Sequence, residues 1–144
     1  MTQAQPARRI GRSILAVLAG MVVAIALTLG SDKVLRLTGI FPPLGQSMVG
    51  YDGAFLLATV YRTVYGVLGS YLTAWLAPAR PMKHALVGGY LGVAANVVGV
   101  VVAFIKGPAL GPLWYPLALV VLALPTAWMG GKLRVSQLST DAPR

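Results

Sequence analysis

The sequence predicts an all-α integral membrane protein, an antiparallel bundle of four transmembrane helices with both termini in the cytoplasm. Of its 144 residues, 57% are hydrophobic and only 10% are charged, and the mean hydropathy is +0.76. A soluble domain has roughly a quarter of its residues charged. In a chain this short about a third of the surface stays exposed on folding. The small number of charged residues cannot cover that exposed surface. Lipid must therefore surround most of it.

Four long apolar segments carry this prediction. We place the spans at about 13–31, 53–79, 85–105 and 112–131. Three of them contain no charged residue, and the second contains only Arg62. At about 1.5 Å rise per residue, each is long enough to cross a hydrocarbon core of roughly 30 Å. The predicted organisation is a basic cytoplasmic N-terminus at 1–12, a transmembrane domain at 13–131 and a cytoplasmic tail at 132–144.

The basic residues between the spans set the orientation. Eight Lys and Arg residues fall at the two termini and in the connection between the second and third spans, against three in the other two connections. The positive-inside rule therefore predicts cytoplasmic termini. The residues that we assign to lipid headgroups and topology are Arg8, Arg9, Arg12, Arg80, Lys83, His84, Lys132 and Arg134. Aromatic residues near the span ends agree with this orientation, with Trp75 and Trp128 inside and Tyr51, Trp114 and Tyr115 outside.

The first span has an alternative interpretation as a signal peptide, because Arg8, Arg9 and Arg12 precede an apolar stretch. The stretch is longer than a typical signal-peptide core, and no clear small-residue cleavage site follows it. A retained first span is therefore favoured.

The longest connection, at 32–52, contains Phe41-Pro-Pro-Leu-Gly45, which interrupts any helix there. Apolar residues in it, Phe41 among them, indicate that it lies on the membrane surface.

Charge and composition exclude several functions. The net charge of +9 comes mostly from the gaps between apolar runs, where anionic headgroups account for it better than nucleic acid does. The chain has no Cys and no Glu, and Asp32, Asp52 and Asp141 all fall outside the predicted spans. Paired carboxylates, a Ser/His/Asp arrangement and a metal cluster inside the membrane are therefore excluded. We expect no catalytic residue, metal or cofactor, and no enzymatic activity.

Arg62 is the one charge inside a predicted span. Placing an Arg there costs roughly 2.5–3.5 kcal/mol on insertion scales, so its head must face protein, water or headgroups. Arg62 and Asn96 each lie nine residues from the outer ends of neighbouring antiparallel spans, at a depth of about 13 Å. We therefore predict that the Arg62 guanidinium donates a hydrogen bond to the Asn96 side-chain carbonyl. Tyr65 and Tyr61 are predicted as further partners in this polar cluster.

Several partners remain open for the charge of Arg62, because no carboxylate lies at its depth. Snorkelling brings the guanidinium toward Asp32 or Asp52 near the surface. Otherwise a partner subunit, a lipid phosphate or an anionic ligand supplies the negative charge. Arg62 is then a satisfied clamp within the bundle, part of a ligand or ion pathway, or a contact with another subunit.

Small residues follow the three-and-four spacing along one face of the second and third spans. Such faces let helix backbones approach closely in a membrane. The glycines that we assign to helix packing are Gly66, Gly69, Gly88, Gly92 and Gly99. These faces also hold Arg62 and Asn96, so the second and third spans are predicted to form the heart of the bundle.

Three stretches carry a resemblance to a known family. They are Phe41-Pro-Pro-Leu-Gly45, the run from Tyr61-Arg62-Thr-Val-Tyr65 to Leu76-Ala-Pro78, and Trp114-Tyr-Pro116 followed by Gly130-Gly-Lys132. On these the chain resembles an uncharacterised family of small four-helix bacterial inner-membrane proteins. The resemblance covers most of the chain and implies an inner-membrane location and no assigned activity. The chain is not similar to the small multidrug resistance transporters, because their acidic residue in the first span has no counterpart at 13–31.

Together these features predict a small accessory or structural membrane subunit that packs against a larger membrane complex or forms a homo-oligomer. Packing features are abundant, whereas reactive side chains are nearly absent. The alternative is a small oligomeric transporter or channel for an anion or polar solute, with Arg62 and Asn96 lining its path. Membrane lipids are the other expected partners.

Overall fold

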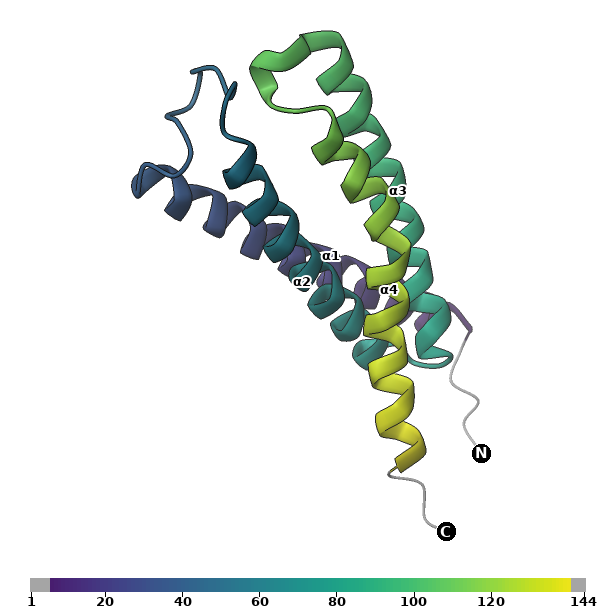
Figure 1. Cartoon of the computed structure of the whole chain (residues 1–144). Helices are drawn as coiled ribbons and strands as arrows, with labels where there is room; N and C mark the ends of the chain where they lie inside the picture. The colour runs from purple at the N-terminus through teal and green to yellow at the C-terminus, as the bar shows by residue number, and fades with distance from the viewer. Residues whose placement is uncertain (1–5, 141–144) are drawn as a thin grey trace, which may run out of the picture.

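A computed structural model describes residues 6–140 as four long helices and one short 3-10 helix (Figure 1). The elements are α1 (Pro6–Leu37), α2 (Asp52–Leu76), α3 (Pro81–Lys106), η1 (Gly107–Leu110) and α4 (Trp114–Thr140). Successive helices run in opposite directions, so the start of α1, the α2–α3 turn and the end of α4 share one end of the molecule (Figure 1). We call the opposite end, formed by the 38–51 loop and η1, the loop end.

Three helices in the described part of the chain are long and apolar enough to cross a membrane. The segments are Arg9–Leu37, Pro81–Leu110 and Trp114–Thr140. Helix α2 is not among them, because Arg62 and three tyrosines lower its hydropathy. Large apolar side chains are exposed on the outside of the bundle, as at Phe104 and Val121. The fold is therefore all-α and consistent with a multi-pass membrane protein.

Two helices extend well beyond the apolar runs of the sequence. Helix α1 continues through Asp32 to Leu37, because the first backbone that ends a helix is Gly39, with a φ of 78°. Helix α4 continues past Pro125 to Thr140 and includes most of the segment expected to be a tail at 132–144. Asp32, which the sequence places after the first span, is thus part of a continuous helix.

Close backbone approaches at glycines join α2 to its neighbours. Helices α1 and α2 cross at Gly20 and Gly69, where a Cβ on Gly69 would lie 2.6 Å from the Gly20 carbonyl oxygen. Helices α2 and α4 meet at Gly130, where a Cβ would lie 2.5 Å from the Val67 carbonyl oxygen. No side chain larger than hydrogen fits at these distances, so glycine is what permits both crossings.

Helix α4 packs along both α2 and α3 and holds the bundle together (Figure 1). Its buried residues are Thr126, Ala127, Gly130 and Gly131. Helix α3 meets it at Gly89, where a Cβ would lie 2.5 Å from the Ala127 Cβ. Helix α3 buries only Ala85 and Gly89. The heart of the bundle is therefore α2 with α4, rather than the α2 and α3 pair that the sequence predicts.

The five glycines assigned to packing differ in their surroundings. Gly66 and Gly69 face α4 and α1, and a Cβ on Gly66 would lie 3.1 Å from an atom of α4. Gly92 is at ordinary contact distance, 3.9 Å from α4. Among residues 6–140, nothing lies within 4 Å of a Cβ built at Gly88 or Gly99. The glycine face of α3 is therefore only partly covered by the chain's own helices.

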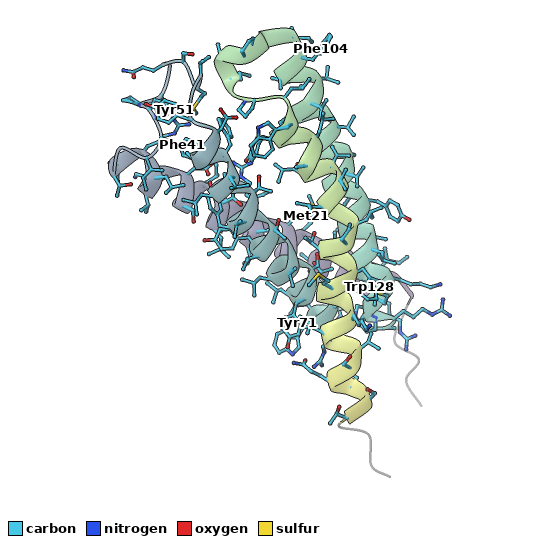
Figure 2. All side chains as sticks on the ribbon, viewed as in Figure 1. Met21, Phe41, Tyr51, Tyr71, Phe104 and Trp128 are labelled. Atoms are coloured by element: carbon cyan, nitrogen blue, oxygen red, sulfur yellow. The ribbon has the colours of Figure 1, made fainter. Side chains whose placement is uncertain are left out.

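The 38–51 loop packs against the start of α2. Phe41 is buried, with 4% of its surface exposed, and its ring meets Phe55 edge-on at 5.5 Å between centroids. Tyr51 packs against the same cluster, and Phe41 and Tyr51 lie together at the loop end (Figure 2). The Met48 N–H also donates to the Ala109 carbonyl in η1 at 3.0 Å. Phe41 is thus a core residue of the loop end, whereas Leu37, Ile40 and Leu44 of the same segment are exposed.

Candidate functional site

An ion pair between α1 and α2 lies at the centre of the site. Nη2 of Arg62 donates to Oδ2 of Asp32 at 2.8 Å, and the two side chains are 30% and 23% exposed. The Tyr61 hydroxyl donates to the other carboxylate oxygen, Oδ1. Asp32 therefore binds two consecutive residues of α2. The charge of Arg62 has a carboxylate partner within the chain, one of the two that the snorkelling alternative names.

The continuity of α1 explains why the sequence prediction overlooked a carboxylate at this depth. Neither proline nor glycine occurs between Ser31 and Thr38, so the helix carries Ser31 and Asp32 alongside α2. Ser31 Oγ and the Tyr65 hydroxyl are hydrogen-bonded at 2.8 Å. The sequence did contain a sign that α1 continues past Ser31, namely the absence of proline and glycine before Thr38. The prediction ended the span earlier because it followed the end of the apolar run.

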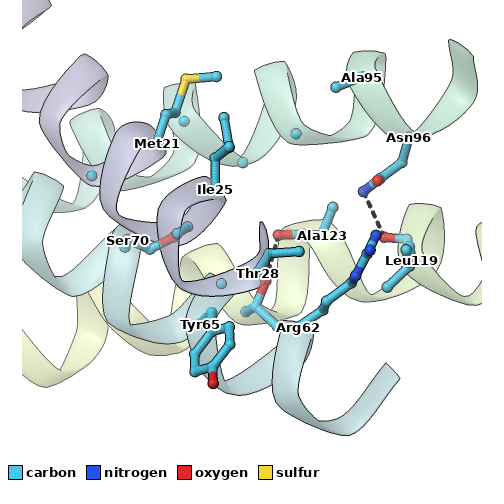
Figure 3. Close-up of a pocket in the computed structure, with 18 of the residues that line it drawn as sticks. Met21, Ile25, Thr28, Arg62, Tyr65, Ser70, Ala95, Asn96, Leu119 and Ala123 are labelled. Atoms are coloured by element: carbon cyan, nitrogen blue, oxygen red, sulfur yellow. Dashed lines mark hydrogen bonds between the residues drawn. The ribbon is translucent and has the colours of Figure 1, made fainter. Parts of the chain in front are cut away.

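The predicted hydrogen bond between Arg62 and Asn96 is not formed. The Asn96 Nδ2 instead donates to the Leu119 carbonyl of α4 at 3.1 Å (Figure 3). The reason is the packing of α3, which lies mainly along α4 and only to a small extent along α2. Asn96 therefore finds a backbone acceptor on α4, and Arg62 turns to α1 for its partner.

Arg62 and Asn96 nevertheless border the same empty space. A cavity of about 370 Å³, the inner cavity, lies between all four helices and includes both residues in its wall (Figure 3). Met21, Ile25 and Thr28 of α1 and Ala123 of α4 also border it. The uncovered Gly88 and the more closely packed Gly92 belong to its α3 wall.

A second cavity, of about 320 Å³, lies toward the loop end, and we call it the outer cavity. Residues of α3, η1 and α4 form most of its wall, and it ends beside Gly111 and Pro112. Both cavities are bordered by Arg62, Ala95, Asn96 and Leu119. The two cavities therefore share part of their wall, which includes Arg62 and Asn96.

Tyr115 is a site residue that the sequence assigns to the outer membrane interface. Its ring centroid lies 5.5 Å from Cζ of Arg62, within the range of a cation–π contact. The same ring packs against Phe55 at 4.8 Å between centroids. Proximity to Arg62 arises from the meeting of α2 and α4, which no local pattern reveals.

The hydrogen-bonding capacity of Arg62 is only partly used. A guanidinium has five N–H donors, and the hydrogen bond recorded for Arg62 is the one from Nη2 to Asp32. Among the described residues Nε is buried and has no partner. Nη1 also has no recorded hydrogen bond among residues 6–140, so it is the donor that Arg62 leaves unused where it borders the two cavities.

The basic residues assigned to headgroups gather at the end opposite the loop end, at the start of α1, in the α2–α3 turn and on α4 (Figure 1). Lys132 Nζ lies 4.4 Å from the Trp128 ring centroid, and His84 Nδ1 lies 3.2 Å from the Arg80 carbonyl oxygen. The side chain of Arg8 and residues 1–5 and 141–144 lie outside the described part of the chain.

Four antiparallel helices, three of them able to cross a membrane, are consistent with the class of multi-pass membrane proteins. No protein-family model, curated protein or solved structure matches this chain. Function is therefore inferred from the geometry alone.

Proposed function

We propose that this chain is a four-span protein of the bacterial inner membrane with both termini in the cytoplasm, from the small-protein family that it resembles. Helix α2 would be the fourth span. Supporting this, α2 packs against both α1 and α4, which are apolar enough to cross. Arg62, the one charged residue of α2 beyond its first residue, is paired with Asp32 inside the protein, which lowers the cost of placing Arg62 within a membrane.

Within that membrane, the proposed role is that of an accessory or structural subunit that associates with a larger complex or with a second copy. The open glycine face of α3 carries this proposal. Gly88 and Gly99 have nothing within 4 Å of a Cβ among residues 6–140. Because glycine faces let membrane helices approach closely, we expect a helix from another subunit to pack against α3 here, over the parts of the two cavities that Gly88 and Gly99 border.

Site-specific photo-crosslinking tests the association. A photoreactive amino acid is placed at Gly88, and the matched control is placed at Val98, which is 62% exposed on α3. We expect position 88 to yield a discrete adduct of protein mass in cells, and position 98 to yield lipid adducts. Lipid adducts alone at both positions would contradict the subunit role.

The wall that the two cavities share at Arg62 and Asn96 favours a second candidate function, a small transporter or channel. Arg62 and Asn96 border both spaces, so a solute passing from one to the other would contact both residues. Because Asp32 already neutralises Arg62, the path suits an uncharged polar solute better than an anion.

Vesicle swelling measures this second candidate. The purified protein is reconstituted into phospholipid vesicles and challenged with a glycerol gradient. Faster swelling than in empty vesicles is expected, and the double variant D32N/R62M should abolish the gain, since it removes the polar constriction without leaving a net charge. The lipid-facing variant V98L serves as the control. Swelling no faster than in empty vesicles would rule out glycerol-like solutes.

A further inference from the structure

We propose that the inner and outer cavities together bind one uncharged amphiphile of the monoacylglycerol type. Its hydroxyl and ester headgroup lies beside Arg62 and Asn96, and its acyl chain occupies the inner cavity. This inference rests on the cavity-based candidate function but does not require the ligand to cross the membrane.

The dimensions and lining of the cavities fit such a ligand. Volumes of about 370 and 320 Å³ lie within the range of roughly 300–1,000 Å³ that is usual for small-molecule sites. Apart from Arg62, no charged residue borders the inner cavity. Glycine, alanine and aliphatic side chains make up most of its wall, as at Met21, Ile25, Gly92 and Ala123. An acyl chain is the chemistry that this wall accepts.

Polar groups converge at the wall that the two cavities share. Arg62 Nη2 donates to Asp32 and Nε is buried, whereas no hydrogen bond is recorded for Nη1 within residues 6–140. The Asn96 amide nitrogen is held by the Leu119 carbonyl, and the structure records no hydrogen bond to the Asn96 Oδ1 within residues 6–140. That oxygen is thus an available acceptor. A headgroup with both hydroxyl and ester oxygens satisfies the Nη1 donor of Arg62 and the acceptor of Asn96 together.

Charge decides between a neutral and an anionic headgroup. Arg62 and Asp32 sum to zero, and Arg62 borders a cavity that residues of all four helices line. An added carboxylate or phosphate would leave a net negative charge in a region of low dielectric, where an uncompensated charge is costly. The site therefore prefers an uncharged ligand.

Photolabelling of the full chain in phosphatidylcholine nanodiscs tests the inference. The probes are a diazirine monoacylglycerol and the fatty acid with the same chain and diazirine position. Monoacylglycerol is expected to label peptides of α3 and α4 that border the inner cavity, about tenfold more than the fatty acid. A preference of this size corresponds to about 1.4 kcal/mol. Equal labelling by both probes, or a preference for the fatty acid, would overturn the assignment.

Two variants and one control locate the label. Gly92→Leu fills the inner cavity, since a Cβ there meets only Ala123 at 3.9 Å, and D32N/R62M removes the donors while keeping the site neutral. D32N/R62M should reduce labelling about tenfold, the loss expected for one hydrogen bond to a charged group. G92L should reduce it by taking the space of the acyl chain, whereas V98L should not. If G92L fails to fold, D32N/R62M decides alone. Undiminished labelling in D32N/R62M would overturn the inference.

The photolabelling and swelling experiments test the binding site and the transport candidate separately. Monoacylglycerol labelling without glycerol swelling removes the transport candidate and supports the binding site. Glycerol swelling without monoacylglycerol labelling supports the transport candidate and overturns the binding site.

Discussion

Asp32 of α1 and Arg62 of α2, thirty residues apart in the chain, form an ion pair with 2.8 Å between Oδ2 and Nη2. The same two helices cross at Gly20 and Gly69. One electrostatic contact and one close backbone approach therefore fix how α2 lies along α1. Helix α1 needs both, because it packs far less against α3 than against α2.

Removing the carboxylate should destabilise the fold. Asp32→Asn leaves Arg62 uncompensated in a half-buried position, and we expect a loss of about 1–3 kcal/mol, between the values for exposed and buried pairs. Thermal unfolding in one detergent measures it. Asp52→Asn is the control, because Asp52 accepts only an exposed hydrogen bond from Trp114, and a change within about 0.5 kcal/mol is expected. Adding Arg62→Met to Asp32→Asn should recover stability. An unaltered melting temperature in D32N would show that the pair is not formed in solution.

Two glycine-to-alanine changes should have opposite effects. A Cβ at Gly69 would lie 2.6 Å from the Gly20 carbonyl oxygen, so G69A should force α1 and α2 apart and cost about 1–3 kcal/mol. Gly88 has nothing within 4 Å in the described structure, so G88A should raise stability by about 1 kcal/mol through helix propensity. Unfolding of both variants in the same detergent measures the difference. Equal melting temperatures would contradict the α1–α2 crossing.

The loop end should depend on Phe41. Its buried ring packs on Phe55, and truncation to alanine in a core costs about 3–5 kcal/mol. Leu44 lies in the same loop and is 83% exposed, so L44A should leave stability nearly unchanged. Limited proteolysis of the 38–51 loop provides the measurement, with faster cleavage expected in F41A alone. Equal cleavage rates would place Phe41 outside the core.

Membrane orientation can be tested by cysteine labelling, because the sequence contains no cysteine. Ser47 in the 38–51 loop and Ser139 near the end of α4 are both exposed. We expect an impermeant maleimide to label S47C in intact spheroplasts and S139C only after the membrane is opened. Labelling of both from outside would contradict the three spans, α2, α3 and α4, that we propose between the two positions, and with them the return of α4 to the cytoplasm.

Much of the fold was predictable from local pattern. The apolar runs predict four helices, and proline and glycine at Pro78-Ala-Arg-Pro81 and Gly107-Pro108 mark two of the turns. Helix ends were less predictable, because α1 and α4 continue beyond the apolar residues wherever no breaker intervenes. The length of an apolar run indicates how much of a helix lipid can solvate. The helix itself ends where its backbone groups can no longer form helical hydrogen bonds, which can be several residues later.

The site was predictable in part. The cost of a charge in a membrane singled out Arg62, and helix periodicity placed Asn96 on the glycine face of α3. The equal depth of Arg62 and Asn96 then suggested a hydrogen bond between them. Depth does not determine how each helix is rotated about its axis, or which neighbouring helix it packs against. Asn96 bonds to α4 and Arg62 to α1.

By itself the sequence determined that this chain is made of long apolar helices with one charge among them, because hydropathy and helix period are local properties. Tertiary structure alone decided that Asp32 compensates Arg62, that α4 rather than α3 completes the centre of the bundle, and that Arg62 and Asn96 border two cavities. Those relationships depend on where glycines let two backbones meet. Close approach is a property of pairs of helices, so it cannot be seen in either helix separately.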